Sequence, residues 1–302
     1  MYAADDPRST MPQAGTTANA ARMFKGAEYA RWYEQAPQEQ GPGAQTWYTR
    51  GQNMIVTYTK ADGGAVLARD AQPDEYMLLL PSKDSVVQVT AGEQSKTVPG
   101  YSVVVVPPGR SSIEVKAAGP IVRILSTNAL DLLPKCSNAE SYATEPDPNV
   151  KPFAAWPDPP GGFAIRSYSL DIPKSPTRFG RLFRCSTIMI NCIHPSPPRD
   201  TKNLSPHHHA DFEQGSLCLE GAYTHYLRWP WVTDKAAWRA DAAELCRAPS
   251  LCIIPPPAIH TSQSMDDTNV LVDIFAPPRA DFSSKPGWVL NADEYPMPAS
   301  AT

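Results

Sequence analysis

Short runs of β-branched and aromatic residues, separated by clusters of proline, glycine and polar residues, recur along most of this chain. Between positions 54 and 127 these runs are MIVTYT, AVLA, YMLLL, SVVQVT, YSVVVVP, SSIEVK and IVRILST. Several of them alternate apolar and polar residues, which is the period of a strand with one buried face. The chain also has 33 prolines, which helix interiors exclude and strands admit mainly at their edges. The pattern predicts an all-β protein made of barrels or sandwiches.

The same pattern begins again after a proline-rich segment, which predicts two β-domains in tandem. The later runs are FAIRSYSLDI, RLFRCSTIMINCI, GSLCLEG, YTHYLRW, SLCIIP and VLVDIFA, interrupted by a polar, helix-compatible insert at 233–248. The two halves can be laid over each other at an offset of roughly 140 residues, as a duplicated domain requires. We expect a tail with a short helix that starts at Ala21 (1–45), a first barrel (46–133), a linker (134–162), a second barrel (163–290) and a tail (291–302).

Composition and charge exclude several classes of partner. A formal net charge of -4 gives no electrostatic reason to expect nucleic acid or an anionic membrane. No apolar stretch approaches the roughly 20 residues that span a bilayer. The first residues, MYAADDPRST, contain acids where a signal peptide needs a basic and then an apolar run. We therefore expect a cytoplasmic protein whose six cysteines are reduced and packed.

The histidines predict a metal site in the second half of the chain. All six lie between positions 194 and 260. Alternate residues of a strand face the same side, so His207 and His209 point one way, and Glu213 shares that face if the strand continues regularly. A further ligand must come from another strand, and His260 is the candidate that follows a tight proline turn. Imidazole nitrogens with one carboxylate suit iron, manganese, nickel or zinc.

This arrangement resembles the cupin superfamily. Its first motif, G-x5-H-x-H-x3or4-E-x6-G, is matched by His207, His209 and an acid or amide before Gly221. Its second motif, G-x5-P-x-G-x-x-H-x3-N, is matched by the run from Pro255 to His260, with Pro257 where the motif has glycine. The resemblance implies a bicupin, that is, two tandem jelly-roll barrels, with one divalent ion per chain held in the second barrel.

The sequence leaves two candidates for the fourth ligand, the adjacent residues Glu213 and Gln214. Counting forward from His209, the motif assigns Glu213, whereas counting back from Gly221 assigns Gln214, which would need a bulged strand. We favour Glu213, because a carboxylate binds a divalent ion more strongly than a neutral amide does.

The first copy of the motif has lost its histidines. Arg69 and Ala71 stand in the histidine positions, Glu75 stands in the acid place, and Ser112 replaces the last histidine. We therefore expect no metal in the first barrel, which serves as scaffold, dimer surface or lid.

Three functions are compatible with these residues. The first and preferred hypothesis is a non-haem dioxygenase, an oxidoreductase that acts on a small aromatic or keto acid with Fe²⁺, or with Mn²⁺, Ni²⁺ or Zn²⁺ in its place. The second is a redox-neutral metal-dependent isomerase, lyase or decarboxylase, and the third is a small-molecule binding protein without catalysis. Arg228 and Tyr226, on the strand after Gly221, are the candidates for binding the substrate. Sheet edges left open by two barrels predict a homodimer.

Overall fold

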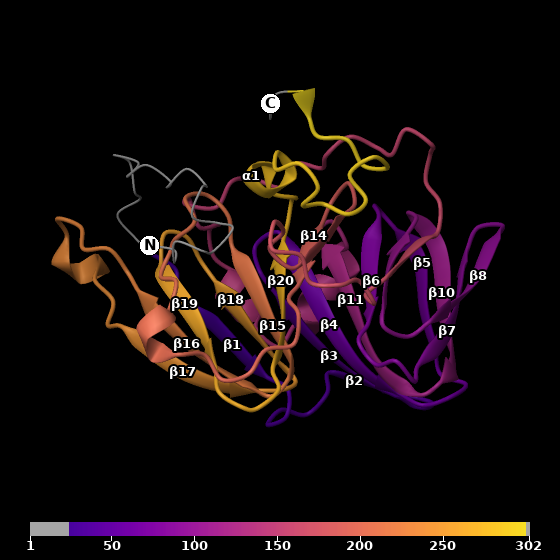
Figure 1. Ribbon diagram of the computed structural model, residues 1–302, viewed down its shortest axis with the longest axis horizontal. Helices are drawn as coiled ribbons and strands as arrows, with labels where there is room; N and C mark the ends of the chain where they lie inside the picture. The colour runs from indigo at the N-terminus through magenta and orange to yellow at the C-terminus, as the bar shows by residue number, and fades with distance from the viewer. Residues whose placement is uncertain (1–23, 300–302) are drawn as a thin grey trace.

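The computed structural model describes residues 24–299, which are built almost entirely of β-strands (Figure 1). The strands form four sheets, and the sheets combine in pairs into two barrels that lie side by side. All of the strand pairs in these sheets are antiparallel. The all-β class predicted from the short alternating runs is therefore confirmed.

The first barrel consists of a seven-stranded and a four-stranded sheet. The larger sheet has the order β12-β9-β6-β11-β4-β3-β2, with β2 Glu39–Gly41, β3 Ala44–Arg50, β4 Met54–Ala61, β6 Tyr76–Leu80, β9 Ser102–Val106, β11 Gly119–Ser126 and β12 Arg166–Ser169. The smaller sheet has the order β5-β10-β7-β8, with β5 Val66–Gln72, β7 Val86–Ala91, β8 Gln94–Pro99 and β10 Gly109–Ala117. One apolar core joins the two sheets, with Leu78 from the larger and Val89 and Ile113 from the smaller.

The second barrel consists of a six-stranded and a three-stranded sheet. The larger sheet has the order β1-β18-β15-β20-β14-β13, with β1 Glu28–Arg31, β13 Arg181–Arg184, β14 Met189–Cys192, β15 Gln214–Glu220, β18 Ser250–Ile254 and β20 Val270–Phe275. The smaller sheet has the order β17-β16-β19, with β16 Ala222–Arg228, β17 Ala242–Arg247 and β19 Ile259–Ser264.

The short helices of the described chain are η2 Leu130–Lys135, η3 Ala139–Tyr142, η4 Thr201–Asn203, η5 Lys235–Ala237 and α1 Ala280–Ser283.

Each barrel receives one strand from the other half of the chain. β1, drawn in indigo among orange and yellow strands in Figure 1, pairs with β18 of the second barrel, Glu28 opposite Ile253. β12 pairs in turn with β9 of the first barrel, Arg166 opposite Val105. The division into a barrel at 46–133, a linker and a barrel at 163–290 stays a prediction. In the structure, β1 from before the first predicted barrel pairs in the second barrel, and β12 from after the predicted linker pairs in the first barrel.

The two large sheets also share a core. Residues from both fill one buried cluster, among them Val56, Leu79 and Val105 from the seven-stranded sheet and Leu217 and Ile274 from the six-stranded sheet. Each of these side chains is at most 1% exposed. Because apolar burial is the dominant favourable term in folding, this shared core holds the barrels in a fixed relation.

Two local predictions are wrong. The segment that begins at Ala21 is predicted to be helical, but its described part, residues 24–35, holds strand β1 and no helix, because pairing with β18 satisfies the backbone groups of the strand. The helix-compatible insert at 233–248 contains only the single turn η5 and then strand β17, which pairs with β16. Residues 1–20, predicted to be a tail, lie outside the described residues.

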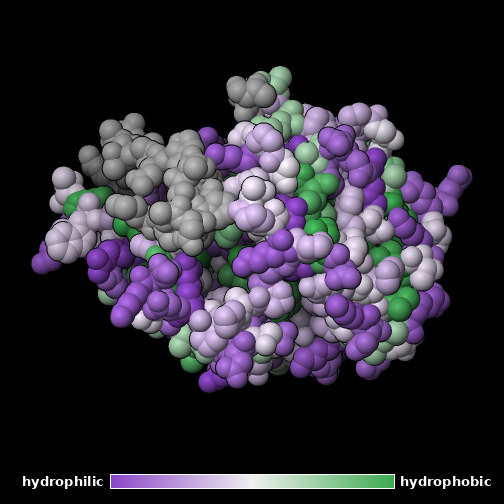
Figure 2. All heavy atoms as spheres, in the orientation of Figure 1, coloured by the Kyte–Doolittle hydropathy of each residue, from purple (hydrophilic) through white to green (hydrophobic). Residues whose placement is uncertain are grey.

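The surface and the thiols agree with a globular chain. Hydrophilic residues cover most of the face in Figure 2, with smaller apolar areas among them. The six cysteines are buried free thiols, as expected from their scattered spacing. Among residues 24–299, no helix has the length and apolar character needed to cross a bilayer.

Candidate metal centre

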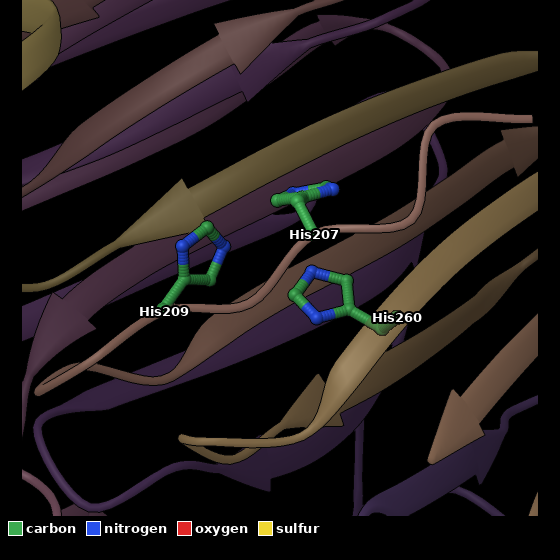
Figure 3. A group of neighbouring side chains, drawn as sticks. All are labelled: His207, His209 and His260. Atoms are coloured by element: carbon green, nitrogen blue, oxygen red, sulfur yellow. The ribbon is translucent and has the colours of Figure 1, made fainter. Parts of the chain in front are cut away.

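Three of the four predicted metal ligands converge in the second barrel. One ring nitrogen from each of His207, His209 and His260 lies within 4.8 Å of the others. Figure 3 shows the three rings facing one another, two from the segment before β15 and one from β19. His209 and His260 are 5% and 2% exposed, so the cluster lies inside the barrel. Among the described residues, this is the one group of histidine, cysteine or acidic side chains with the spacing of a metal site.

The backbone brings these histidines together. His207 and His260 face each other as an isolated antiparallel bridge, in which each N–H donates to the other residue's carbonyl, at 3.0 and 2.7 Å. Residues opposite each other in such a pair project to the same side. At the start of β19, Ile259 is 38% exposed while His260 is buried. The proline turn before β19 and the strand pairing therefore place both rings on the inner face.

Backbone carbonyls fix the orientation of two of the rings. Nδ1 of His207 lies 2.9 Å from the carbonyl of Ser205, and Nδ1 of His260 lies 2.9 Å from the carbonyl of Ala258. A carbonyl only accepts, so the proton must sit on Nδ1, which makes Nε2 the nitrogen suited to a metal. This support of the non-ligating nitrogen is common around metal-binding histidines.

His209 is held as a neutral imidazole. Burial, then the charge of Arg279 and the neighbouring imidazoles, keep its pKa well below the usual value. Neutral imidazole is the form that binds a metal.

Gln214, the alternative fourth ligand, lies in the cluster. Its Oε1 is 2.9 Å from Nε2 of His209, while its Nε2 donates to Ser216 Oγ and Asp273 Oδ1, both at 3.0 Å. The two acceptors on its amide nitrogen turn the amide oxygen toward the histidines. In the structure this contact is a hydrogen bond in which Nε2 of His209 donates to Oε1 of Gln214. Two donors of one ion that each lie roughly 2.0–2.2 Å from it are also about 3 Å apart, so the same placement suits a shared ion once that proton is lost.

Glu213, the preferred fourth ligand, does not lie with the histidines. Its carboxylate accepts the backbone N–H of Gln52 at 2.5 Å and the hydroxyl of Tyr142 at 3.0 Å, and both donors belong to the first half of the chain. Burial raises the pKa of this carboxyl to about 7. The regular strand assumed from His207 onward is absent, because residues 208–213 are irregular and β15 begins only at Gln214.

A cavity of about 410 Å³ opens beside the cluster. Its polar wall includes His207, His260, Gln214, Asp273 and Arg279. Its apolar wall is made of Phe179, Ile193, Leu271, Phe275 and Phe282. The volume lies in the range of small-molecule sites, which combine an apolar wall with a few polar groups.

Arg279 supplies positive charge to this cavity. It is 7% exposed and stacks on the ring of Phe282, 3.7 Å from its centroid. Its Nε and Nη2 bind the carboxylate of Asp281, at 3.0 and 2.5 Å. No acceptor among residues 24–299 makes a hydrogen bond with its Nη1. One edge of the guanidinium is therefore fixed, and another remains to meet a ligand in the cavity.

The residues predicted to bind substrate lie elsewhere. Arg228 is exposed and pairs with Asp241 on the outside of the barrel. The hydroxyl of Tyr226 donates to Gln263 at 3.0 Å, and neither residue lines the cavity. Alternation along β16 is the reason, because Tyr223, His225 and Leu227 are its buried, inward residues. Arg228 and Tyr226 take the opposite face.

Sequence reasoning missed Asp273 and Arg279. Asp273 has a visible signal, since it is an acid in the middle of the apolar run VLVDIFA. An acid there had to be buried with a hydrogen-bonding partner. Arg279 has no such signal, because it follows β20 in an irregular segment that only the fold brings to the cavity.

In the first barrel, other side chains occupy the positions equivalent to the proposed metal ligands of the second. Arg69 binds Asp131 through both terminal nitrogens, at 2.6 and 2.9 Å. Tyr76 follows Glu75 as Gln214 follows Glu213, and its hydroxyl lies 3.1 Å from Ser111 Oγ. The first 193 residues contain no histidine, and the absence of a metal from this barrel stays a prediction.

Comparison with known proteins identifies the architecture. No protein-family model and no curated protein sequence matches this chain. Among solved structures, it is similar to the Lactobacillus farciminis oxalate decarboxylase formate complex, with 12% identity, 88% of each chain covered and a TM-score of 0.56. It is also similar to Bacillus subtilis oxalate decarboxylase at pH 4.6, with 12% identity, 87% and 77% covered and a TM-score of 0.54. Both are bicupins. The fold is that of two tandem cupin barrels.

The bicupin comparison also corrects the expected enzyme class. The similar structures are decarboxylases, which belong to the lyases, so the prediction of a metal-dependent oxidoreductase of the dioxygenase type is wrong. The preference for Fe²⁺ rested on dioxygenase chemistry and is dropped with it.

Proposed function

We propose that this protein is a metal-dependent decarboxylase of a small carboxylic acid. The observation that carries the proposal is the cavity in the second barrel. Its wall includes the guanidinium of Arg279 and two histidines, His207 and His260, of the cluster that could hold a metal. A metal and a fixed cation in one small cavity suit an anionic substrate. The similarity to oxalate decarboxylases supports the redox-neutral alternative among the three functions considered.

The metal ligands in this proposal are His207, His209, His260 and Gln214. All four are neutral, so a divalent first-row transition-metal ion would keep its full charge and attract a carboxylate directly. When bound, such an ion acts as a Lewis acid that withdraws electrons from the substrate's oxygens. Asp273 and Ser216 keep the amide of Gln214 oriented, so its oxygen faces the histidines before any ion arrives.

Arg279 would hold a carboxylate of the substrate. Its guanidinium is kept in place by Asp281 on one edge and by the ring of Phe282 on its face. A guanidinium held in this way loses little conformational entropy on binding an anion. The apolar side chains of Phe179, Phe275 and Leu271 exclude water around the anion, which strengthens its attraction to the cation.

The proposal is tested by incubating metal-loaded protein with oxalate, malonate and small 2-keto acids. We expect CO₂ release from one of these acids, with the shortened acid as the other product by NMR and no net consumption of O₂. A protein that carries metal but releases no CO₂ from any acid of the panel would contradict the proposal, as would stoichiometric O₂ uptake.

Arg279→Lys should weaken turnover of the carboxylate substrate by roughly 10- to 100-fold in kcat/KM, because hydrogen bonds to charged groups contribute about 1.5–3 kcal/mol. Lysine keeps the charge but loses the planar fork. The matched control is Arg228→Lys, which alters an exposed arginine outside the cavity and should leave the kinetics unchanged. Equal effects of the two substitutions would exclude Arg279 as the carboxylate anchor.

We also propose that the protein is a homodimer. β17 is an edge strand, because it pairs only with β16 among the described strands. The side chains of Arg31 and Tyr33 contact its outer backbone at Leu245 and Arg247, while the side chain of Leu245 is 42% exposed. Edge strands with exposed apolar side chains favour association. Light scattering at micromolar concentration should give twice the 33.0 kDa mass of the chain, and a monomer would contradict this.

A further inference from the structure

The buried carboxylate of Glu213 links the second barrel to the first. It directly precedes Gln214, but the two side chains diverge, one toward the metal cluster and one toward the turn between β3 and β4. That turn contributes the N–H of Gln52, and the helix η3 contributes the hydroxyl of Tyr142. Glu213 is 2% exposed, so these donors replace its hydration.

Gly51 is adapted to this contact. A Cβ built at this position would lie 2.6 Å from Oε2 of Glu213, closer than side chains approach. The carboxylate of Glu213 therefore occupies the space of a side chain at position 51, and any residue other than glycine there requires Glu213 or its neighbours to shift.

The same arrangement occurs in the first barrel with the roles of the halves exchanged. Glu75 is fully buried and accepts the backbone N–H of Ser186 at 3.2 Å and its hydroxyl at 2.8 Å, while the hydroxyl of Tyr295 donates at 3.0 Å. Ser186 lies in the turn between β13 and β14, the counterpart of the turn between β3 and β4. Each barrel thus offers a glutamate to a turn of the other barrel and to a tyrosine.

We call each buried glutamate with its hydrogen-bond donors a clasp: Glu213 with Gln52 and Tyr142, and Glu75 with Ser186 and Tyr295. The two clasps are related by the duplication of the chain. The offsets are 138 residues for the glutamates (213−75), 134 for the turn residues (186−52) and 153 for the tyrosines (295−142), against a repeat of roughly 140 that is lengthened by the insert at 233–248. They differ in the residue next to the glutamate. Glu213 precedes Gln214 beside the histidines, whereas Glu75 precedes Tyr76, which fills the barrel and contacts Ser111.

We propose that the clasp on Glu213 positions Gln214 for metal binding, so that the first barrel acts as a support for the metal site of the second. This inference rests on the proposed metal site. Neighbouring residues at the start of a strand project to opposite faces, so anchoring Glu213 in the first barrel directs Gln214 into the second. Glu213 and Tyr142 are positioning residues. The clasp on Glu75 joins the barrels without touching a metal ligand.

The duplication supplies a matched pair of variants, Tyr142→Phe and Tyr295→Phe. Each removes one hydroxyl from one clasp. Affinity for Mn²⁺ and Zn²⁺ is measured by competition with a chelator, and thermal unfolding of the metal-free protein is measured alongside. We expect both variants to lower the unfolding temperature of the metal-free protein. Only Tyr142→Phe should weaken metal affinity, by about 10-fold, the lower end of outer-sphere effects.

Gly51→Ala provides a second route to the same clasp, since the added Cβ must displace the carboxylate of Glu213. It should weaken metal affinity as Tyr142→Phe does. Unchanged metal affinity in both Tyr142→Phe and Gly51→Ala, or an equal loss in Tyr295→Phe, would overturn the positioning role. A wild-type chain that binds neither ion would overturn the metal site and the positioning role together. Metal binding without CO₂ release would overturn the decarboxylase alone, because affinity is measured independently of turnover.

Discussion

His260→Ala should lower the affinity of this chain for a divalent metal ion by more than about 100-fold and abolish turnover. Loss of an outer-sphere partner alone costs about 10- to 100-fold in metal affinity or activity, and this change removes one of the proposed ligands. His260 is also the only member of the cluster on β19, so its loss leaves the ligands on one segment of chain. Metal content after dialysis, by mass spectrometry, measures the effect.

His208→Ala is the matched control for this prediction. His208 lies between two of the proposed ligands in the sequence but is not part of the cluster. The variant should retain one metal per chain. A His260→Ala protein that keeps stoichiometric metal would show that the ion is bound elsewhere.

Phe183→Ala should destabilise the protein by about 3–5 kcal/mol, the usual cost of removing a large buried aromatic side chain. Phe183 is 1% exposed in the core that the two large sheets share. Its ring stacks on Tyr168 of the exchanged strand β12, with centroids 5.3 Å apart. The substitution therefore leaves a cavity and removes a contact between the barrels. Denaturant unfolding of the metal-free protein measures the loss.

Leu130→Ala is the control for packing, because Leu130 is 70% exposed. Its effect should stay within about 0.5 kcal/mol. If Phe183→Ala were equally mild, the shared core would not be what holds the two barrels together.

The strands could be predicted where the period of the sequence carries the information. Runs such as MIVTYT and VLVDIFA appear as β4 and β20, because alternation of buried and exposed positions is local. β1 and β17 could not be predicted, because their sequences, EYAR and AAELCR, lack β-branched residues and are compatible with a helix. β1 is a strand because it pairs with β18, more than 200 residues away in the sequence. β17 is a strand because it pairs with β16 across a hairpin. Tertiary pairing overrides local preference in such segments.

The site shows the same division. The histidines could be predicted from their spacing in the sequence. His207 and His209 are two residues apart on one segment, and His260 follows a proline turn. The choice between Glu213 and Gln214 could not, because it depends on where β15 begins, and the irregular residues before it break the alternation. The count back from Gly221 runs along β15, whose pairing with β20 shifts register between Cys218 and Glu220, and it gives Gln214, the residue whose amide oxygen lies beside His209.

The cation in the cavity could not be predicted for a related reason. Arg228 lies on the right strand but on its outer face, as the buried positions of Tyr223 and His225 show. Arg279 reaches the cavity from an irregular segment whose path no periodicity encodes.

A crystal structure of the metal-loaded protein, with anomalous diffraction at the absorption edge of the ion, tests the central claim most directly. We expect one anomalous peak per chain, bonded to His207, His209, His260 and Gln214, with Glu213 still bound to Gln52 and Tyr142. A peak coordinated by Glu213, a peak in the first barrel near Arg69, or no peak at the histidine cluster would contradict the account.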